Sequence, residues 1–105
     1  MVDATSLGGI RAAIDAVDAD LVRLLARRER LVRQAAPLKR DVQAVQAPGR
    51  VEQVVARARA QAAAAGADPD VVERIYRAMI QAFIDMELTE HQRVMDRSPD
   101  KGVIE

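Results

Sequence analysis

The sequence has no cysteine, one histidine, one tyrosine and one phenylalanine, and each shortage excludes a class of function. Without cysteine the chain forms no disulfide, thiolate nucleophile or zinc site with sulfur ligands, and it suits a reducing compartment. His91 is a weak metal signal because no second imidazole accompanies it, so we expect neither a metal nor another cofactor. So few aromatic side chains also disfavour a surface that stacks on nucleic-acid bases or a large apolar ligand-binding pocket.

An excess of charge of one sign is missing too, because 16 basic residues balance 16 acidic ones in a chain of 105 residues. No overall field attracts nucleic acid or an anionic membrane, and any recognition of anions has to be local. The first residues, MVDATSLGG, lack the pattern of a signal peptide, and no run approaches the roughly 18 apolar residues of a membrane span. We therefore expect a cytoplasmic protein that binds neither nucleic acid nor membranes.

Glycine and proline are sparse, and the three long stretches that they leave predict an all-α fold of one long, one short and one medium helix. The first helix starts near Ser6 or Gly9. Pro37 should kink it, and the apolar pattern predicts that it continues beyond this proline. The pattern is a heptad seam, with alternating spacings of four and three, formed by Ile10, Ile14, Val17, Leu21, Leu24, Arg28, Leu31, Ala35, Leu38 and Val42.

A break at 46–49 precedes the second helix, which should end at Gly66. Asp68-Pro69-Asp70 provides an N-cap, a proline at the first helical position and an acidic first turn for the third helix, which should reach the region of Arg93. The second helix has a face of small residues at Val51, Val54, Val55, Ala58 and Ala62, and the third an apolar stripe at Val72, Ile75, Tyr76, Met79, Ile80, Phe83, Ile84 and Leu88. We expect one helical domain over 1–97 and a solvated tail over 98–105.

The expected length of the first helix has a consequence for assembly. About 32 residues at about 1.5 Å each make a rod of roughly 48 Å, longer than a compact domain of this mass. Pairing with the same helix of a second chain would cover the exposed ends of its seam. The sequence therefore predicts a homodimer in which the two long helices pack against each other.

Arg28 is the one charged member of the seam, and burying a guanidinium is costly unless an anion meets it. That anion could be a ligand, or a carboxylate of the chain such as Glu52 or Glu87, and the side chain could also extend to the edge of the seam. Lys39 returns to the same helical face eleven positions later. Arg11 is too far from Arg28 to share a small ligand within one chain, although an antiparallel partner helix would bring it close. Arg11 and Lys39 could equally be solvated charges.

Glu87 falls on the apolar stripe of the third helix. Loss of water around its carboxyl favours the neutral, proton-donating form, whereas nearby cations favour the anion. A structural ion pair with an arginine or with His91, one turn further on, is an alternative, and His91 itself is expected to be exposed.

Three stretches carry a resemblance to a known family: IRAAIDAVDADLVRLLARRERLVRQAAPLKRD, APGRVEQV and YRAMIQAFIDMELTEHQ. Together they resemble the all-helical chorismate mutases of type II, from about Leu7 to His91. The resemblance implies an intertwined homodimer in which Arg11 from the partner chain and Arg28 hold the carboxylates of a chorismate-like dianion. It also implies that Lys39 and Glu87 donate to the substrate's ether oxygen, and that Arg50 lies near the ring or a carboxylate.

Chorismate becomes prephenate by an intramolecular rearrangement in which charge gathers on the ether oxygen, so fixed cations are sufficient. The resemblance therefore implies an isomerase of aromatic amino-acid biosynthesis without a cofactor. Glu87 would have to be protonated to donate, so activity should fall as the pH rises.

The sequence departs from the family at the residues beside Arg50, where relatives often have acidic side chains. Ala47, Pro48 and Val51 stand there, and this A-P-x-R-V run looks more like the related isochorismate pyruvate lyases. Pro37, two residues before Lys39, is a second departure and leaves the placement of that ammonium open. Besides a chorismate mutase, the sequence thus permits an isochorismate pyruvate lyase, a mutase for an amino-substituted chorismate, or a non-catalytic dimerisation or regulatory module.

Overall fold

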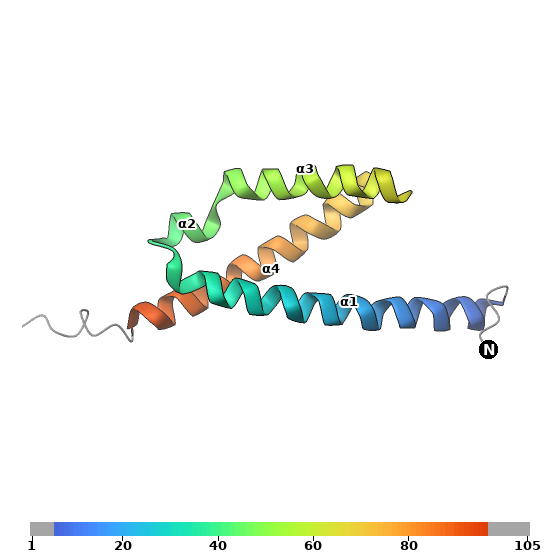
Figure 1. The fold of residues 1–105 in the computed structure, drawn as a ribbon, viewed down its shortest axis with the longest axis horizontal. Coiled ribbons are helices and arrows are strands. Elements are labelled where there is room, and N and C mark those ends of the chain that lie inside the picture. Colours follow the sequence, from blue (N-terminus) through green and yellow to red (C-terminus); the bar gives the residue numbers. More distant parts are fainter. Residues whose placement is uncertain (1–5, 97–105) are drawn as a thin grey trace, which may run out of the picture. The chain divides into compact units, whose positions relative to one another are not determined.

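A computed structural model describes residues 6–96, and within this range the chain is entirely helical, with no strand. The three longer helices confirm the all-α prediction (Figure 1). None of the helices in this range is long and apolar enough to cross a membrane. The predicted tail at 98–105 lies outside the described residues. The elements follow one another as α1 (Leu7–Ala35), the 3₁₀ turn η1 (Ala36–Leu38), α2 (Val42–Gln46), α3 (Pro48–Ala65) and α4 (Pro69–Asp96).

The described chain divides within α1 into two units, one through Leu31 and the other from Val32 onward. In the first unit Ser6 begins the helix as predicted, because its Oγ accepts a hydrogen bond from the N–H of Gly9 at 2.9 Å. The apolar seam of this unit stands open to solvent. The exposed fractions of its large side chains range from 44% to 63%, at Ile10, Ile14, Val17, Leu21, Leu24 and Leu31.

The prediction that the first helix continues beyond Pro37 is wrong. Helix α1 ends at Ala35 after 29 residues, and Pro37 lies in η1. Proline lacks the N–H that would continue the helical hydrogen bonds, and its ring clashes with the carbonyl four residues earlier, so here the helix stops. Lys39 follows in an extended conformation. The chain then forms α2, which the sequence analysis missed although Asp41 caps it by accepting from the N–H of Ala44 at 2.9 Å.

The break predicted at 46–49 is narrower in the structure, because only Ala47 separates α2 from α3. Ala47 has φ 36° and ψ 63°, a left-handed conformation that is uncommon for residues other than glycine. Pro48 then occupies the first turn of α3, where its missing N–H has no helical acceptor to lose. Together Ala47 and Pro48 turn the chain between the two helices.

Helices α3 and α4 form a hairpin whose ends agree with the sequence analysis (Figure 1). Gly66 ends α3 at φ 82°, and its N–H donates to the carbonyls of Ala62 and Ala63. Asp68 begins α4 by accepting from the N–H of Asp70 at 2.9 Å, with Pro69 at the first position. These helix ends depend only on adjacent residues, which explains why the sequence predicted them.

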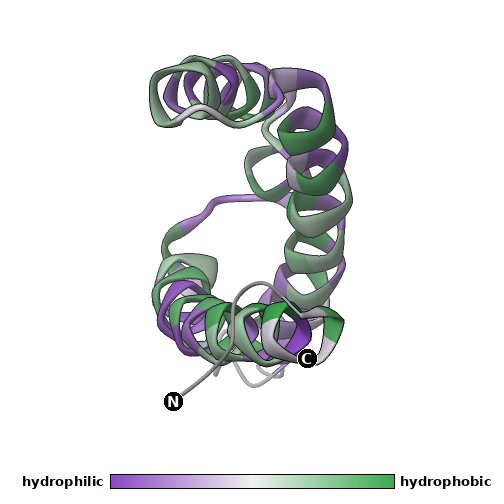
Figure 2. Cartoon of the chain, turned by 90° about the vertical axis from the view of Figure 1, so that its right-hand side faces the viewer, coloured by the Kyte–Doolittle hydropathy of each residue, from purple (hydrophilic) through white to green (hydrophobic). Residues whose placement is uncertain are grey.

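Small side chains let α3 and α4 approach closely. Ala58 and Ala62 of α3 are buried, as is Ile80 of α4, while Ile75, predicted on the same stripe, is 59% exposed. The hydrophobic and hydrophilic parts of the ribbon alternate along the helices, as amphipathic helices require (Figure 2). The core of the second unit consists of Ala36, Val45, Val55, Ala58, Ala62 and Ile80.

A network of ion pairs also joins α3 to α4. Arg77 donates to both carboxylate oxygens of Glu52 at 2.9 Å and to Glu73 at 2.7 Å, and Arg59 contacts Glu73 and Asp70. Hydrogen bonds from Arg77 lower the pKa values of Glu52 and Glu73 below their usual range, and the two carboxylates raise the pKa of Arg77. Because Arg77 binds Glu52, this carboxylate has a structural partner on α4.

Candidate active site

Lys39 and Glu87 come together where the connection after α1 packs against α4. Lys39 follows η1 directly, and both η1 and α2 contact α4. The ammonium of Lys39 lies 2.5 Å from Oε2 of Glu87. The residue Glu87 is 4% exposed, whereas the side chain of Lys39 is 30% exposed. The pair thus has a buried carboxyl and an ammonium that solvent or a ligand can reach.

Oε2 of Glu87 lacks a hydrogen bond among the described residues. The atom is buried and has no hydrogen-bond partner within residues 6–96, so the contact with Lys39 has the distance of an ion pair without the alignment of a hydrogen bond. A buried polar oxygen in this condition is costly. It can gain a hydrogen bond if the lysine side chain shifts into better alignment or if a bound molecule donates one.

The prediction that His91 is exposed is wrong. His91 is 6% exposed, and its Nε2 lies 2.8 Å from the backbone carbonyl oxygen of Lys39. The spacing along α4 explains this burial: Ile80, Ile84, Glu87 and His91 follow one another at helical intervals of four and three, so they share one face. That interval was the sequence signal that could have revealed His91. Both Glu87 and His91 therefore face the segment that bears Lys39.

The turn before Lys39 is anchored at several points of the second unit. Ala36 in η1 is fully buried, and the guanidinium of Arg33, at the end of α1, lies 3.4 Å from the carboxylate of Glu90 on α4. Arg93 supports the same carboxylate at 3.2 Å. These contacts fix the 33–39 segment against the C-terminal half of α4.

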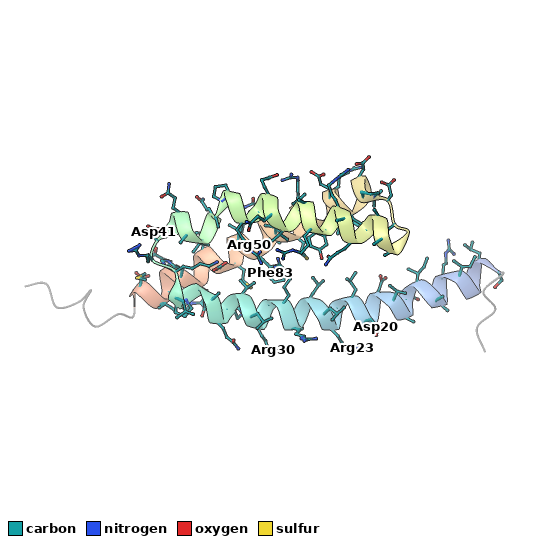
Figure 3. All side chains as sticks on the ribbon, turned by 45° about the horizontal axis from the view of Figure 1, so that its top comes forward. Asp20, Arg23, Arg30, Asp41, Arg50 and Phe83 are labelled. Carbon is teal, nitrogen blue, oxygen red and sulfur yellow. The ribbon has the colours of Figure 1, made fainter. Side chains whose placement is uncertain are left out.

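Arg50 lies on the first turn of α3, close in sequence to the Ala47 turn (Figure 3). It is exposed and makes no hydrogen bond or ion pair with any residue that the structure describes. A cation without an internal partner remains able to bind an anion.

Arg11 and Arg28 both lie on the part of α1 that forms the first unit, whereas Lys39, Arg50 and Glu87 belong to the second. Arg11 is exposed and Arg28 is half-buried. The structure thus brings together Lys39 and Glu87 among the predicted site residues, and it adds His91 to them. Within the described range no three histidine, aspartate or glutamate side chains gather as a metal site would require.

These observations define an all-helical protein whose predicted site residues are arginines, a lysine and a glutamate. Residues 10–88 match the family Chorismate mutase type II. The chain belongs to this family. An isochorismate pyruvate lyase from Pseudomonas aeruginosa is 35% identical to it over 82 residues, which are 78% of this chain and 81% of that protein. Together, the family and this relative support an enzyme of chorismate metabolism.

Proposed function

We propose that the protein is a chorismate mutase, which converts chorismate to prephenate by electrostatic stabilisation of the transition state. The observation that carries the proposal is the pairing of Lys39 with the buried Glu87 at 2.5 Å. A lysine that solvent can reach and a buried carboxyl that carries a proton are suited to donating two hydrogen bonds to one oxygen. The family match supports this assignment.

The reaction needs little beyond positioning and charge. The C–O bond of the ether breaks while a C–C bond forms within the same molecule, and negative charge develops on the ether oxygen. The ammonium of Lys39 stabilises that charge, and protonated Glu87 donates a second hydrogen bond to the same oxygen. Both interactions strengthen as the charge develops, which lowers the barrier more than it favours substrate binding.

The arginines would bind the two substrate carboxylates. In this proposal Arg28 holds one carboxylate, Arg11 from the other chain of a homodimer holds the second, and Arg50 lies near the ring or a carboxylate. Holding both carboxylates selects the compact conformer in which the reacting carbons meet. The exposed apolar seam of α1 supports the homodimer, because so long an apolar face is unfavourable in water.

A second candidate function is isochorismate pyruvate lyase, which forms salicylate and pyruvate. The run Ala47-Pro48-Gly49-Arg50-Val51 favours it, since no acidic side chain adjoins Arg50 to contact a substrate hydroxyl. The relative from Pseudomonas aeruginosa bears that name. A mutase for an amino-substituted chorismate would use the same positions. Glu87 favours a mutase because, once protonated, it supplies the second donor to the ether oxygen.

Product analysis tests the proposal. The purified protein is supplied separately with chorismate and with isochorismate, and the products are identified by chromatography and mass spectrometry. Prephenate from chorismate, at a rate above the uncatalysed reaction, is the expected result and would place the enzyme in aromatic amino-acid biosynthesis. Salicylate and pyruvate from isochorismate would identify a lyase instead, and turnover of neither compound would favour a non-catalytic module.

A further inference from the structure

His91 joins the backbone of Lys39 to the helix that bears Glu87. Its Nε2 lies 2.8 Å from the carbonyl oxygen of Lys39, and the residue is 6% exposed. His91 lies three positions beyond the end of the segment that matches the family, so the family match says nothing about it. The structure shows its contact with Lys39 directly.

The chemistry of the contact fixes the direction of the hydrogen bond. A backbone carbonyl oxygen only accepts, so Nε2 of His91 must carry the hydrogen and donate it to Lys39. A neutral His91 is consequently the Nε2–H tautomer. An imidazole held in this way is a donor in both its neutral and its protonated form.

The position of this hydrogen bond matters because Lys39 lies outside regular structure. Lys39 is extended (φ −89°, ψ 139°) between η1 and α2, and its own N–H reaches only the carbonyl of Ala36, at 3.3 Å. A long, flexible side chain on such a segment places its ammonium no better than the backbone is placed. The bond from His91 supplies the missing constraint on the carbonyl side of the residue.

Glu87 and His91 are one helical turn apart on α4 and contact two ends of the same residue. Glu87 meets the ammonium of Lys39, and His91 meets its carbonyl oxygen. Since α4 is rigid over one turn, it fixes the distance between these two contacts. We propose that His91 is a positioning residue, which holds the Lys39 backbone so that its ammonium reaches Glu87 and the reacting oxygen; its effect on turnover rests on the proposed function.

Two amides of different length test the proposal. In His91→Gln the side-chain N–H₂ can occupy the position of Nε2, whereas in His91→Asn the same group stops near the position of Nδ1. We expect His91→Asn to lower kcat by roughly 10- to 100-fold with little change in KM, since a misplacement of about 1 Å can cost that much. His91→Gln should retain most of the wild-type kcat. The substrate is whichever of chorismate and isochorismate the wild-type protein converts.

Glu90→Gln is the matched control, because it weakens the neighbouring anchor of the same turn without touching Lys39. It should lower kcat by less than His91→Asn does, even where thermal unfolding shows a similar loss of stability, because the hydrogen bond to the Lys39 carbonyl remains. Equal loss of kcat in His91→Gln and His91→Asn, or full activity in His91→Asn, would overturn the positioning role. If Glu90→Gln loses as much kcat as His91→Asn, a merely structural role is indicated and the proposal also fails.

Structural measurements separate this inference from the proposed function, and those on the wild-type and His91→Gln proteins remain informative if His91→Asn does not fold. Imidazole ¹⁵N resonances of the wild-type protein should show hydrogen on Nε2 throughout, and the opposite tautomer would contradict the inference. Crystal structures of the His91→Gln and His91→Asn proteins should show the Lys39 ammonium on Glu87 only in the former. These results decide the role of His91 even if neither chorismate nor isochorismate is converted.

Discussion

The Lys39 ammonium lies 2.5 Å from Oε2 of Glu87, and Glu87 is almost completely buried. In the proposed reaction both groups have to donate hydrogen bonds to the substrate's ether oxygen. The distance between Lys39 and Glu87 therefore has to increase when substrate binds. Glu87 is the group whose protonation state decides whether it helps or opposes the developing negative charge.

The role of Glu87 is testable through the pH dependence of activity. A carboxylate cannot donate a hydrogen bond, so in the proposed mechanism wild-type kcat/KM should fall from acid to alkaline pH. In Glu87→Gln the amide N–H₂ donates at every pH, and the profile should stay nearly flat on the alkaline side. Rates of substrate loss measured for both proteins across this range provide the comparison. Parallel profiles for wild type and Glu87→Gln would exclude Glu87 as the titrating donor.

The exposed seam of α1 makes a prediction about assembly. Leu21 is a seam residue and is 51% exposed in the single chain, while its neighbour Val22, at 62%, lies off the seam. Leu21→Glu should convert a homodimer to monomer because it introduces charge into the helix interface, and Val22→Glu should not. Sedimentation equilibrium measures the mass of each protein. A monomeric wild type, or equal dissociation by both substitutions, would contradict the homodimer.

The left-handed residues Ala47 and Gly66 predict opposite responses to exchanging alanine and glycine. Ala47→Gly should raise the free energy of unfolding by about 1 kcal/mol, because a Cβ at φ 36° is strained and glycine is not. Gly66→Ala should lower it by about 1 kcal/mol, and the cost is conformational because no atom beyond the adjacent residues lies within 4 Å of the added Cβ. Urea denaturation measures both. A loss of stability in Ala47→Gly would show that Ala47 is not strained.

The ion pairs between α3 and α4 predict a loss of stability in acid. Hydrogen bonds from Arg77 lower the pKa values of Glu52 and Glu73 in the folded protein below 4.5. A carboxyl with a depressed folded pKa stabilises the protein above its unfolded pKa, and this contribution disappears as the pH falls through the folded value. The urea midpoint should therefore drop between about pH 5 and about pH 3.

Substituting Arg77 should reduce the decrease of the urea midpoint in acid. Arg77→Gln leaves Glu52 and Glu73 without their main donor, so less stability remains to be lost in acid. Arg74→Gln is the control, because Arg74 is an exposed arginine of α4 with no ion pair to any described residue. If the two variants lose stability equally between the two pH values, the network contributes nothing to the acid response.

The sequence predicted those parts of the fold that depend on neighbouring residues. The cap at Asp68, the proline at 69 and the left-handed Gly66 act within one turn, and the structure confirms each. The end of α1 was predicted wrongly because the apolar spacing continues past Pro37, whereas the proline ends the helix. Leu38 continues the heptad seam, yet it is 82% exposed, and the helix had already ended at Ala35. A proline thus outweighed the apolar pattern.

The site could be predicted only in part, for a similar reason. The resemblance to a family suggested Lys39 and Glu87, and their contact requires the turn at Ala36 to bring distant segments together. His91 was predicted to be exposed although its spacing from Ile84 and Glu87 places it on the buried face of α4. Its hydrogen bond to the carbonyl of Lys39 depends on where the 33–39 segment packs, which no local pattern in α4 reveals.

The measurement that tests the central claim most directly is the kcat/KM of Lys39→Met with chorismate, beside that of the wild type. Methionine has a similar length without the charge, so transition-state stabilisation at the ether oxygen should be lost while the segment keeps its hydrogen bond to His91. We expect wild-type turnover to prephenate and a decrease of about 10²- to 10³-fold in the variant. Undiminished turnover in Lys39→Met would contradict the account, because Lys39 would then not act on the reacting oxygen.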